Sequence, residues 1–399
     1  MDPSSASATP DYALREARSD CPLCGSRDLF EMLSFETPVM CNVLFSERQT
    51  ARDADRGRLT LAYCQRCSHV FNSTFEEDKV CYTPNYNSSL EHSAHFRAFA
   101  AALAERLNRS YKLLGKTVVE IGCGKGEFLD RLCGVADAQG VGFDTSADDR
   151  RMPNTTNVRF IRDYFNETYT DVRPDLLIGR HVLEHIAEPV QFLESLRRHP
   201  SIKPDTTFYF EMPNGLYTFR DHGIWDLIYE HVSYFTEASL SMAFERAGFE
   251  LLDVGTSFSE QYIYVEARPS PSRTSDIVRN HEGIKRLIES FGEIYQQKIK
   301  RWAQFVSRHD ARETVVWGAG SKGITFVNAV PGAEQLRALV DLNPRKQGRF
   351  APLHGTPVVC PDDLSTEQPK SIIIMNPVYC DEISRVVAAC APTAELVLA

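Results

Sequence analysis

Residues 118–129 read Val-Val-Glu-Ile-Gly-Cys-Gly-Lys-Gly-Glu-Phe-Leu, an apolar strand that passes through a glycine turn into a helix. The glycines let the backbone lie close beneath a ligand and turn sharply into the helix N-terminus. Their spacing is Gly-x-Gly-x-Gly, which differs from the Gly-x-Gly-x-x-Gly of a pyrophosphate-binding turn. It suits a ligand without phosphate that has an amino acid end and a nucleoside end. Asp144 closes the next strand, where it can accept both ribose hydroxyls, and Asp163 after the third strand is placed for an adenine amino group.

Apolar strand-like runs alternate with amphipathic helical stretches on both sides of this turn, as expected for a parallel sheet flanked by helices. The runs cover residues 117–121, 140–144, 157–161, 175–179, 207–213, 249–255 and 262–268. A Pro- and Ser-rich linker at 268–276 and a long helical pattern at 277–309 follow, and a second αβ series opens at 313–323. The fold class is therefore α/β.

The glycine stretch resembles motif I of the class I S-adenosylmethionine (SAM) methyltransferases, with Asp144 and Asp163 at the positions of the next two motifs. The resemblance implies a Rossmann-like, seven-stranded core whose last strand is antiparallel. It also implies SAM as cofactor, contacted by Glu120, Gly122, Cys123, Gly124, Gly126, Asp144, Asp163 and His181. The alternative is a nucleotide-binding α/β domain of another kind.

Cys21-Pro-Leu-Cys24 and Cys64-Gln-Arg-Cys67 form two CxxC pairs separated by 39 residues. Two such turns complete the tetrahedral shell of four thiolates that Zn²⁺ prefers, with no open position for a water, so we expect a structural site. The gap exceeds that of a compact zinc ribbon, so an insertion must separate the two pairs. A redox-active pair would need a thioredoxin-like context, which this region lacks. Cys41, Cys81 and His69 are less favoured substitute ligands.

The stretch Gly318-Ala319-Gly320-Ser321-Lys322-Gly323 is a second glycine loop between a strand and a helix, and Asp341 ends the next strand-like run. By itself this pattern matches a dinucleotide-binding fingerprint. The segment that follows is too short for a catalytic dehydrogenase. Three interpretations stay open: phosphate of a nucleotide-linked substrate held by Gly318, Gly320, Ser321 and Lys322, a purely structural turn, or a bound dinucleotide.

Polar residues follow two strands of the expected core and also precede it. They occupy 181–185 (His-Val-Leu-Glu-His), 229–235 (Tyr-Glu-His-Val-Ser-Tyr-Phe) and 82–89. The carboxyl ends of parallel strands share one edge of the sheet, so the first two segments should face the cofactor crevice. Imidazoles beside carboxylates and phenols suit proton removal next to a carbonyl. The candidate catalytic residues are His231, His185, Glu230 and Tyr86, against the alternative that each histidine is structural.

Together these features resemble the three-domain sugar C-methyltransferases of deoxysugar biosynthesis. The matching segments are the CxxC pairs and residues 86–89, 120–129, 181–186, 230–235, 318–323 and 376–383. The resemblance implies methylation of the carbon beside the ketone of a nucleotide-linked 4-keto sugar, with His231 as base assisted by Glu230, and with Tyr86 and His185 near the substrate. It gives the expected domains: a tail (1–20), a zinc domain (21–85), a methyltransferase domain (86–268), a linker and helix (269–309), and a Rossmann-like substrate domain (310–399).

The sequence departs from that family at two places. The family usually shows Tyr-x-Glu-His, whereas Tyr229 directly precedes Glu230 here and Ile228 occupies the tyrosine position. Residues 221–227 also differ from the expected pattern. Both places belong to the substrate loop, so the reaction class transfers more readily than the sugar. A C-, O- or N-methyltransferase acting on another small natural product is the alternative.

Composition excludes several other classes of protein. Hydrophobic residues make up 43% and the net charge is −10, which is typical of a globular protein and argues against a general nucleic-acid binder. We find no signal peptide and no apolar run long enough for a membrane helix, and so expect reduced cysteines, a cytoplasmic location and no membrane partner. A zinc-dependent nucleic-acid module and a SAM-binding regulator without turnover are the remaining classes. The oligomeric state is left open.

Overall fold

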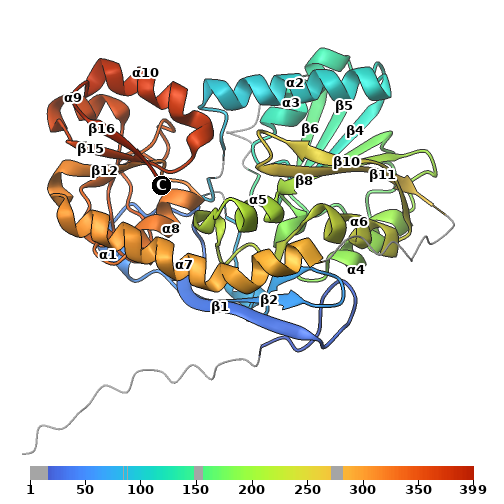
Figure 1. Cartoon of the computed structure of the whole chain (residues 1–399). Helices are drawn as coiled ribbons and strands as arrows, with labels where there is room; N and C mark the ends of the chain where they lie inside the picture. Colours follow the sequence, from blue (N-terminus) through green and yellow to red (C-terminus); the bar gives the residue numbers. More distant parts are fainter. Residues whose placement is uncertain (1–16, 84, 88, 148–155, 271–281) are drawn as a thin grey trace, which may run out of the picture.

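A computed structural model describes residues 17–83, 85–87, 89–147, 156–270 and 282–399. Residues 1–16 of the expected tail, Ser88 of the 86–89 segment and residues 271–276 of the Pro- and Ser-rich linker lie outside the described residues. Among the described residues the strands form three sheets, which occupy separate parts of the molecule (Figure 1).

The central sheet carries the first glycine loop. In the described chain it has seven strands, in the order β10 (Phe249–Ser257), β11 (Tyr262–Pro269), β8 (Thr207–Pro213), β7 (Leu176–Arg180), β4 (Thr117–Ile121), β5 (Gln139–Phe143) and β6 (Val158–Ile161). Strands β8, β7, β4, β5 and β6 are parallel, and β11 is antiparallel to both its neighbours. Each of the seven apolar runs in the sequence forms one of these strands, which confirms the expected class I methyltransferase core.

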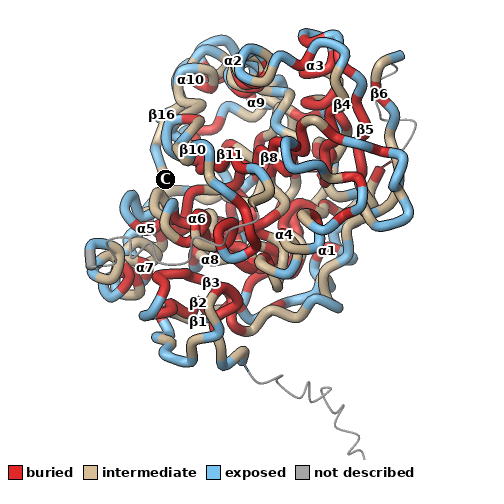
Figure 2. The backbone as a smooth tube through the Cα atoms, turned by 90° about the vertical axis from the view of Figure 1, so that its right-hand side faces the viewer, coloured by how far each residue is buried: buried red, intermediate tan, exposed pale blue. Residues whose placement is uncertain are grey.

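Helices cover both faces of this sheet and explain why its central strands β4, β7 and β8 are buried along nearly their whole length. They are α2 (Ala94–Tyr111), α3 (Glu127–Ala136), α4 (Pro189–Arg198), α5 (Gly215–Arg220) and α6 (Glu237–Arg246), with short 3₁₀ turns η3 (Leu183–His185) and η4 (Ile224–Asp226). Figure 2 shows the strands β4 and β8 as buried backbone beneath exposed helical surfaces. Strands covered on both faces lose the alternation of a half-exposed sheet, as in other parallel sheets.

The N-terminal sheet joins the first part of the chain to the methyltransferase core. Its strands are β1 (Leu29–Pro38), β2 (Arg56–Cys64), β3 (Val70–Asn72) and β9 (Ser233–Tyr234), with α1 (Arg48–Arg52) between β1 and β2 and η1 (Glu77–Lys79) after β3. The hairpin β1–β2 is the insertion that separates the two CxxC pairs. β9 comes from the segment that follows His231 and pairs with β3, Val70 opposite Tyr234. The N-terminal part of the chain therefore holds the segment that follows the candidate base His231 in place.

The C-terminal sheet is parallel throughout, in the order β14 (Val358–Val359), β13 (Ala338–Val340), β12 (Thr314–Trp317), β15 (Ser371–Ile374) and β16 (Glu395–Leu398). Its helices are α8 (Ser321–Ala329), α9 (Leu364–Glu367) and α10 (Cys380–Cys390), with 3₁₀ turns η5 (Ala311–Glu313), η6 (Ala333–Gln335), η7 (Pro361–Asp363) and η8 (Pro377–Tyr379). The second glycine loop lies between β12 and α8, at the carboxyl edge of this sheet.

The long helix α7 (Glu282–Arg308) connects the central and C-terminal parts and runs beneath both in Figure 1. Its buried side chains Ile288, Phe291 and Trp302 belong to one apolar cluster with β2 of the N-terminal sheet and β12 of the C-terminal sheet. The three parts of the chain thus share a core. In the described part of the chain, no helix is both long and apolar enough to cross a membrane.

Candidate functional site

A cavity of about 830 Å³ lies at the carboxyl edge of the central sheet, where the C-terminal sheet faces it. All three parts of the chain line it. The lining includes the first glycine loop, Asp144, Asp163, His181, Glu184, His185, His231, Tyr82, Tyr86, and Gly318, Gly320, Ser321 and Lys322 of the second loop. The candidate catalytic, cofactor and substrate residues that sequence analysis named on both loops and on the polar segments line this one cavity, with the exceptions of Gly126 and Glu230.

The first glycine loop has the backbone conformation that glycine allows. Gly122, Gly124 and Gly126 have φ values of 63°, 57° and 73°, a left-handed region that is costly for other residues. A Cβ atom on Gly126 would also lie 2.1 Å from Cε1 of Phe160. The loop therefore passes close to β6 and leaves the N-terminus of α3 open to a ligand.

Asp144 and Asp163 stand at the ends of β5 and β6 beside this loop. Asp144 accepts hydrogen bonds from the backbone N–H of Gly124 at 2.8 Å and from that of Ser146 at 2.7 Å. Asp163 accepts one from the hydroxyl of Tyr169 at 2.7 Å, and these bonds lower the pKa of its carboxyl. Both carboxylates line the cavity and can also accept from a ligand.

Two further cofactor candidates are polar groups without a hydrogen-bond partner in the described structure. Oε2 of Glu120, at the end of β4, is buried and unpaired, and burial raises the pKa of this carboxyl to about 8. Nε2 of His181 is also unpaired, and His181 has a left-handed φ of 54° with its ring 4.7 Å from that of Tyr262. Cys123 between the loop glycines is buried, and burial raises the pKa of its thiol.

His185 and His231 lie next to each other, with their ring centroids 5.1 Å apart. Burial lowers the pKa of both imidazoles, that of His231 well below 6.5, so both are neutral near pH 7. Nδ1 of His185 lies 2.8 Å from the carbonyl oxygen of Glu230. A carbonyl only accepts, so Nδ1 carries the proton and Nε2 of His185 keeps its lone pair.

Two backbone hydrogen bonds fix the segment that carries His231. The N–H of Val232 donates to the carbonyl of Glu184 at 2.8 Å, and the N–H of Asn72 donates to the carbonyl of Val232 at 2.8 Å. The ring of His231 also interacts with the backbone of Asp226. The base candidate is therefore held by the core, the N-terminal sheet and η4 together.

The side chain of Glu230 points toward the N-terminal part of the chain. Its Oε2 accepts from the backbone N–H of Cys41 at 3.1 Å, and its burial raises the pKa of the carboxyl to about 8. Tyr86 lies nearby, with its hydroxyl 3.4 Å from the amide nitrogen of Asn42. The backbone carbonyl of Glu230 thus contacts His185. Its side-chain carboxyl instead bonds to the backbone of Cys41, in the N-terminal part of the chain.

At the first departure from the family pattern, Ile228 and Tyr229 lie outside the cavity. Ile228 is buried in an apolar cluster, and the hydroxyl of Tyr229 accepts from the backbone N–H of Glu76 at 2.8 Å, outside the cavity. A phenol reaches the histidines from another element, because the hydroxyl of Tyr82 lies 3.0 Å from Nδ1 of His185. Tyr82 belongs to the polar 82–89 segment but was not among the candidates that sequence analysis selected.

Glu184 is a second residue that sequence analysis did not select. It is 2% exposed, and neither carboxylate oxygen has a hydrogen-bond partner in the described structure. Ligand atoms of Glu184, His185 and His231 all lie within 4.8 Å of one another. Its position in the His-Val-Leu-Glu-His segment was the available signal, but a sequence does not show which side of a 3₁₀ turn faces a cavity.

The second glycine loop is linked to the core by paired side chains. Lys322 forms an ion pair with Asp226 of η4, and the hydroxyl of Ser321 lies 3.0 Å from the amide nitrogen of Asn42. Asp341 accepts from the backbone N–H of Ala319 at 2.9 Å, so the acid that a dinucleotide would use bonds to the loop itself. Residues 221–227, which differ from the family pattern, thus contribute one of the contacts between the core and the C-terminal part.

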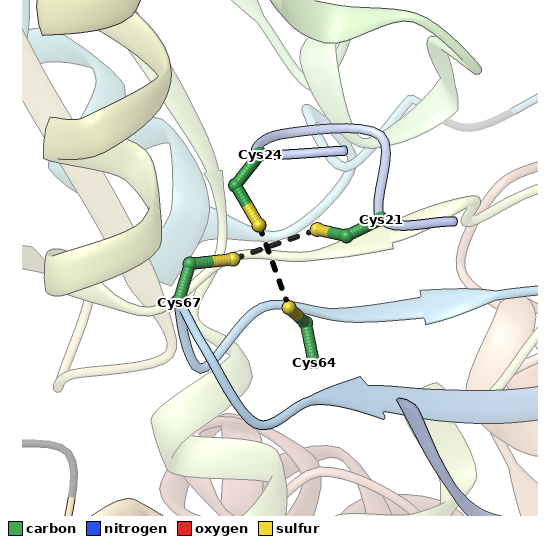
Figure 3. A group of neighbouring side chains, drawn as sticks. All are labelled: Cys21, Cys24, Cys64 and Cys67. Carbon is green, nitrogen blue, oxygen red and sulfur yellow. Dashed lines mark hydrogen bonds between the residues drawn. The ribbon is translucent and has the colours of Figure 1, made fainter. Parts of the chain in front are cut away.

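The two CxxC pairs meet at the end of the β1–β2 hairpin (Figure 3). The sulfur atoms of Cys21 and Cys67 are 3.5 Å apart, as are those of Cys24 and Cys64. A tetrahedral Zn²⁺ with bonds of about 2.3 Å places its thiolates about 3.8 Å apart, so the four sulfurs fit this ion. The substitute ligands lie elsewhere: His69 contacts Ser233 at 3.2 Å, and Cys81 is exposed.

The sheet order, the glycine loop and the acids that follow it define a class I SAM-dependent methyltransferase, and SAM is its cofactor. Comparison with known proteins agrees. Residues 92–254 match a methyltransferase domain, and residues 285–397 match a C-methyltransferase C-terminal domain. The chain is 24% identical over 394 residues to C-methyltransferase NovU of Streptomyces niveus, and the aligned region covers 91% of each protein. These matches confirm the resemblance to the sugar C-methyltransferases that the sequence predicted.

Solved structures of methyltransferases are similar to less than half of the chain. Magnesium protoporphyrin IX methyltransferase from Synechocystis is 17% identical with a TM-score of 0.34, covering 44% of this chain and 84% of that one. A SAM-dependent methyltransferase from Aquifex aeolicus is 18% identical with a TM-score of 0.33, covering 41% and 88%.

Proposed function

We propose that this enzyme methylates the carbon next to the ketone of a nucleotide-linked 4-keto deoxysugar. The observation that carries the proposal is the pair of neutral imidazoles, His185 and His231, at the edge of the sheet where the cofactor loop ends. A carbon-bound hydrogen beside a ketone needs a base that is unprotonated at working pH and donors for the enolate oxygen. O- or N-methylation has less need of such a base.

In this proposal His231 removes the proton from the substrate carbon, and its ring becomes an imidazolium. The hydroxyls of Tyr82 and Tyr86 are the donors available to the enolate oxygen; burial raises the pKa of both phenols, so they remain protonated. When bound, SAM supplies a methyl group that its sulfonium sulfur activates. The substrate carbanion is the nucleophile for this methyl group. The protein contributes proton removal, alignment of the two reactants and exclusion of water.

The second glycine loop would hold the nucleotide-linked end of the substrate. Gly318, Gly320 and Ser321 present the start of α8 to the cavity, and Lys322 lies beside them. A helix N-terminus and a lysine together favour a phosphate group. Since Asp226 already pairs with Lys322, an arriving phosphate would compete with that carboxylate for the ammonium group.

The metal proposal concerns the N-terminal part of the chain. Cys21, Cys24, Cys64 and Cys67 would hold one structural Zn²⁺, because four thiolates leave no coordination position for a substrate or water. The ion would join the start of the chain to the β1–β2 hairpin, which itself pairs through β3 with the catalytic segment at β9.

Asp144 is proposed as the acceptor for the ribose of SAM. The Asp144→Ala variant should raise the dissociation constant for SAM about 10- to 100-fold, because it loses a charge-assisted hydrogen-bond acceptor. Isothermal titration calorimetry measures this change. Asp171→Ala is the matched control, since that side chain is 75% exposed near the opposite edge of the sheet and should leave the affinity unchanged. Equal affinities for both variants would reject the assignment.

The substrate proposal is tested by incubation with SAM and a panel of nucleotide-linked 4-keto sugars in D₂O, followed by mass spectrometry. Gain of one methyl group on the sugar, located on carbon by NMR, is the expected result. Deuterium uptake without methylation would support proton removal by the enzyme and indicate that the true acceptor is chemically similar to the compound tested. No change in any sugar, with SAM still bound, would favour the alternative of a non-sugar natural product, which the substitutions at 221–228 also permit.

A further inference from the structure

Glu184 is a buried carboxylate beside the two imidazoles that has no assigned role. Its side chain is nine-tenths or more buried, and both of its oxygens lack a hydrogen-bond partner in the part of the chain that the structure describes. The nearest cationic candidate is Nδ1 of His181, 3.5 Å from Oε1, which carries charge only when protonated. A buried polar group without a hydrogen-bond partner is costly, so its presence beside the imidazoles calls for a functional explanation.

Glu184 is placed to meet such a partner at the catalytic histidines. Its carboxylate lies within 4.8 Å of ligand nitrogens of His185 and His231, and its backbone carbonyl accepts from Val232, the neighbour of His231. The imidazoles are neutral at rest, so the carboxylate then has no charge opposite it at this face. Proton removal from the substrate creates that charge.

The other groups around the imidazoles do not supply this negative charge. Burial raises the pKa of the Glu230 carboxyl to about 8, so it is protonated near pH 7, and its oxygen faces the backbone of Cys41. Asp226 is paired with Lys322, whose own charge disfavours an imidazolium at His231. Tyr82, the phenol at His185, keeps its proton.

We propose that Glu184 is a positioning residue whose charge stabilises the imidazolium formed on His231, and that this makes proton abstraction from the substrate fast. The inference rests on the proposed function, in which His231 is the base. The substrate C–H bond breaks, an N–H bond forms on the ring, and the electron pair moves onto the ketone oxygen. After the carbanion has taken the methyl group, the imidazolium beside Glu184 returns its proton to water. A group that pairs with charge present only at the transition state lowers the barrier without tightening substrate binding.

The test compares Glu184→Gln with the wild-type enzyme, using SAM and a nucleotide-linked 4-keto deoxysugar that the panel shows to exchange or be methylated. Glutamine keeps the size of the side chain and removes its charge. We expect kcat, and the rate of deuterium exchange at the substrate carbon, to fall on the order of 100-fold. The KM for both reactants and the affinity for SAM should stay within about threefold, because the interaction is made after binding.

The pH profile separates this role from a structural one. Loss of a nearby negative charge lowers the pKa of an imidazole, so the acid limb of kcat/KM should move to lower pH in Glu184→Gln. Glu184→Asp keeps the charge, so its kcat should be at least tenfold higher than that of Glu184→Gln. The aspartate variant also keeps the proposal testable if the glutamine variant does not fold. Glu188→Gln is the matched control, since its side chain is 44% exposed and pairs with Arg18 at 2.6 Å.

Wild-type turnover in Glu184→Gln, or an acid limb that stays in place, would overturn the inference. Failure of the underlying proposal looks different. If His231→Ala still exchanges the substrate proton at the wild-type rate, His231 is not the base, whatever Glu184→Gln shows.

Discussion

The His231→Ala variant is expected to lose methyl transfer and substrate deuterium exchange by about three orders of magnitude, the range that a general base contributes. The ring of His231 lies 5.1 Å from that of His185 and lines the cavity that also holds the first glycine loop. Alanine leaves no group at that position that can accept a proton. SAM affinity should stay within about twofold, because the cofactor candidates come from other strand ends.

The measurement is mass spectrometry of methylated and deuterated product, with calorimetry for SAM. His354→Ala is the control, since this partly buried histidine belongs to the C-terminal part of the chain and lies outside the cavity lining. Because burial lowers the pKa of His231 well below 6.5, the wild-type activity should persist through pH 6.5 and decline only at lower pH. Retained exchange in His231→Ala would transfer the base role to His185, whose Nε2 also keeps a lone pair.

The sequence predicted those features that depend on local pattern. The seven apolar runs are strands, and the glycine turn after Ile121 has the left-handed φ values that its spacing requires. The gap between the CxxC pairs is filled by a hairpin, as an insertion there had to be. These features follow from residue period, glycine conformation and ligand chemistry, which a single sequence displays directly.

Contacts between distant segments could not be predicted in the same way. The residues around β9 do not indicate that they add a strand to the N-terminal sheet, because strand pairing depends on where the whole core places that segment. The pairing of Lys322 with Asp226 joins residues 96 positions apart. Glu184 and Tyr82 were visible as polar residues, but their direction is set by the 3₁₀ turn and the neighbouring parts of the chain that enclose the cavity.

Loss of the Cys₄ site is expected to destabilise the whole enzyme. Cys21, Cys64 and Cys67 are buried in the same apolar cluster as Phe208 and Phe210 of β8, so opening of the two turns would expose the core of the methyltransferase sheet. Structural zinc contributes on the order of 10 kcal/mol to the folding of small zinc domains, and even a few kcal/mol of this would lower the melting temperature by about 10 °C. We expect Cys64→Ser to lose bound zinc and to melt at least that much lower, or to fail to accumulate in folded form.

Elemental analysis of the purified protein and differential scanning calorimetry measure the two effects. Cys81→Ser is the matched control, because Cys81 is exposed and stands apart from the four-cysteine group, so its variant should keep both zinc and stability. A strong chelator added to the wild-type enzyme reaches the same state without mutation and should lower the melting temperature in parallel with zinc release. Because β3 of the N-terminal sheet pairs with β9, deuterium exchange at the substrate carbon should disappear when the zinc is removed, although none of the four cysteines touches the reacting atoms. A wild-type protein that contains no zinc, together with a Cys64→Ser variant that has the wild-type melting temperature, would reject the structural zinc site.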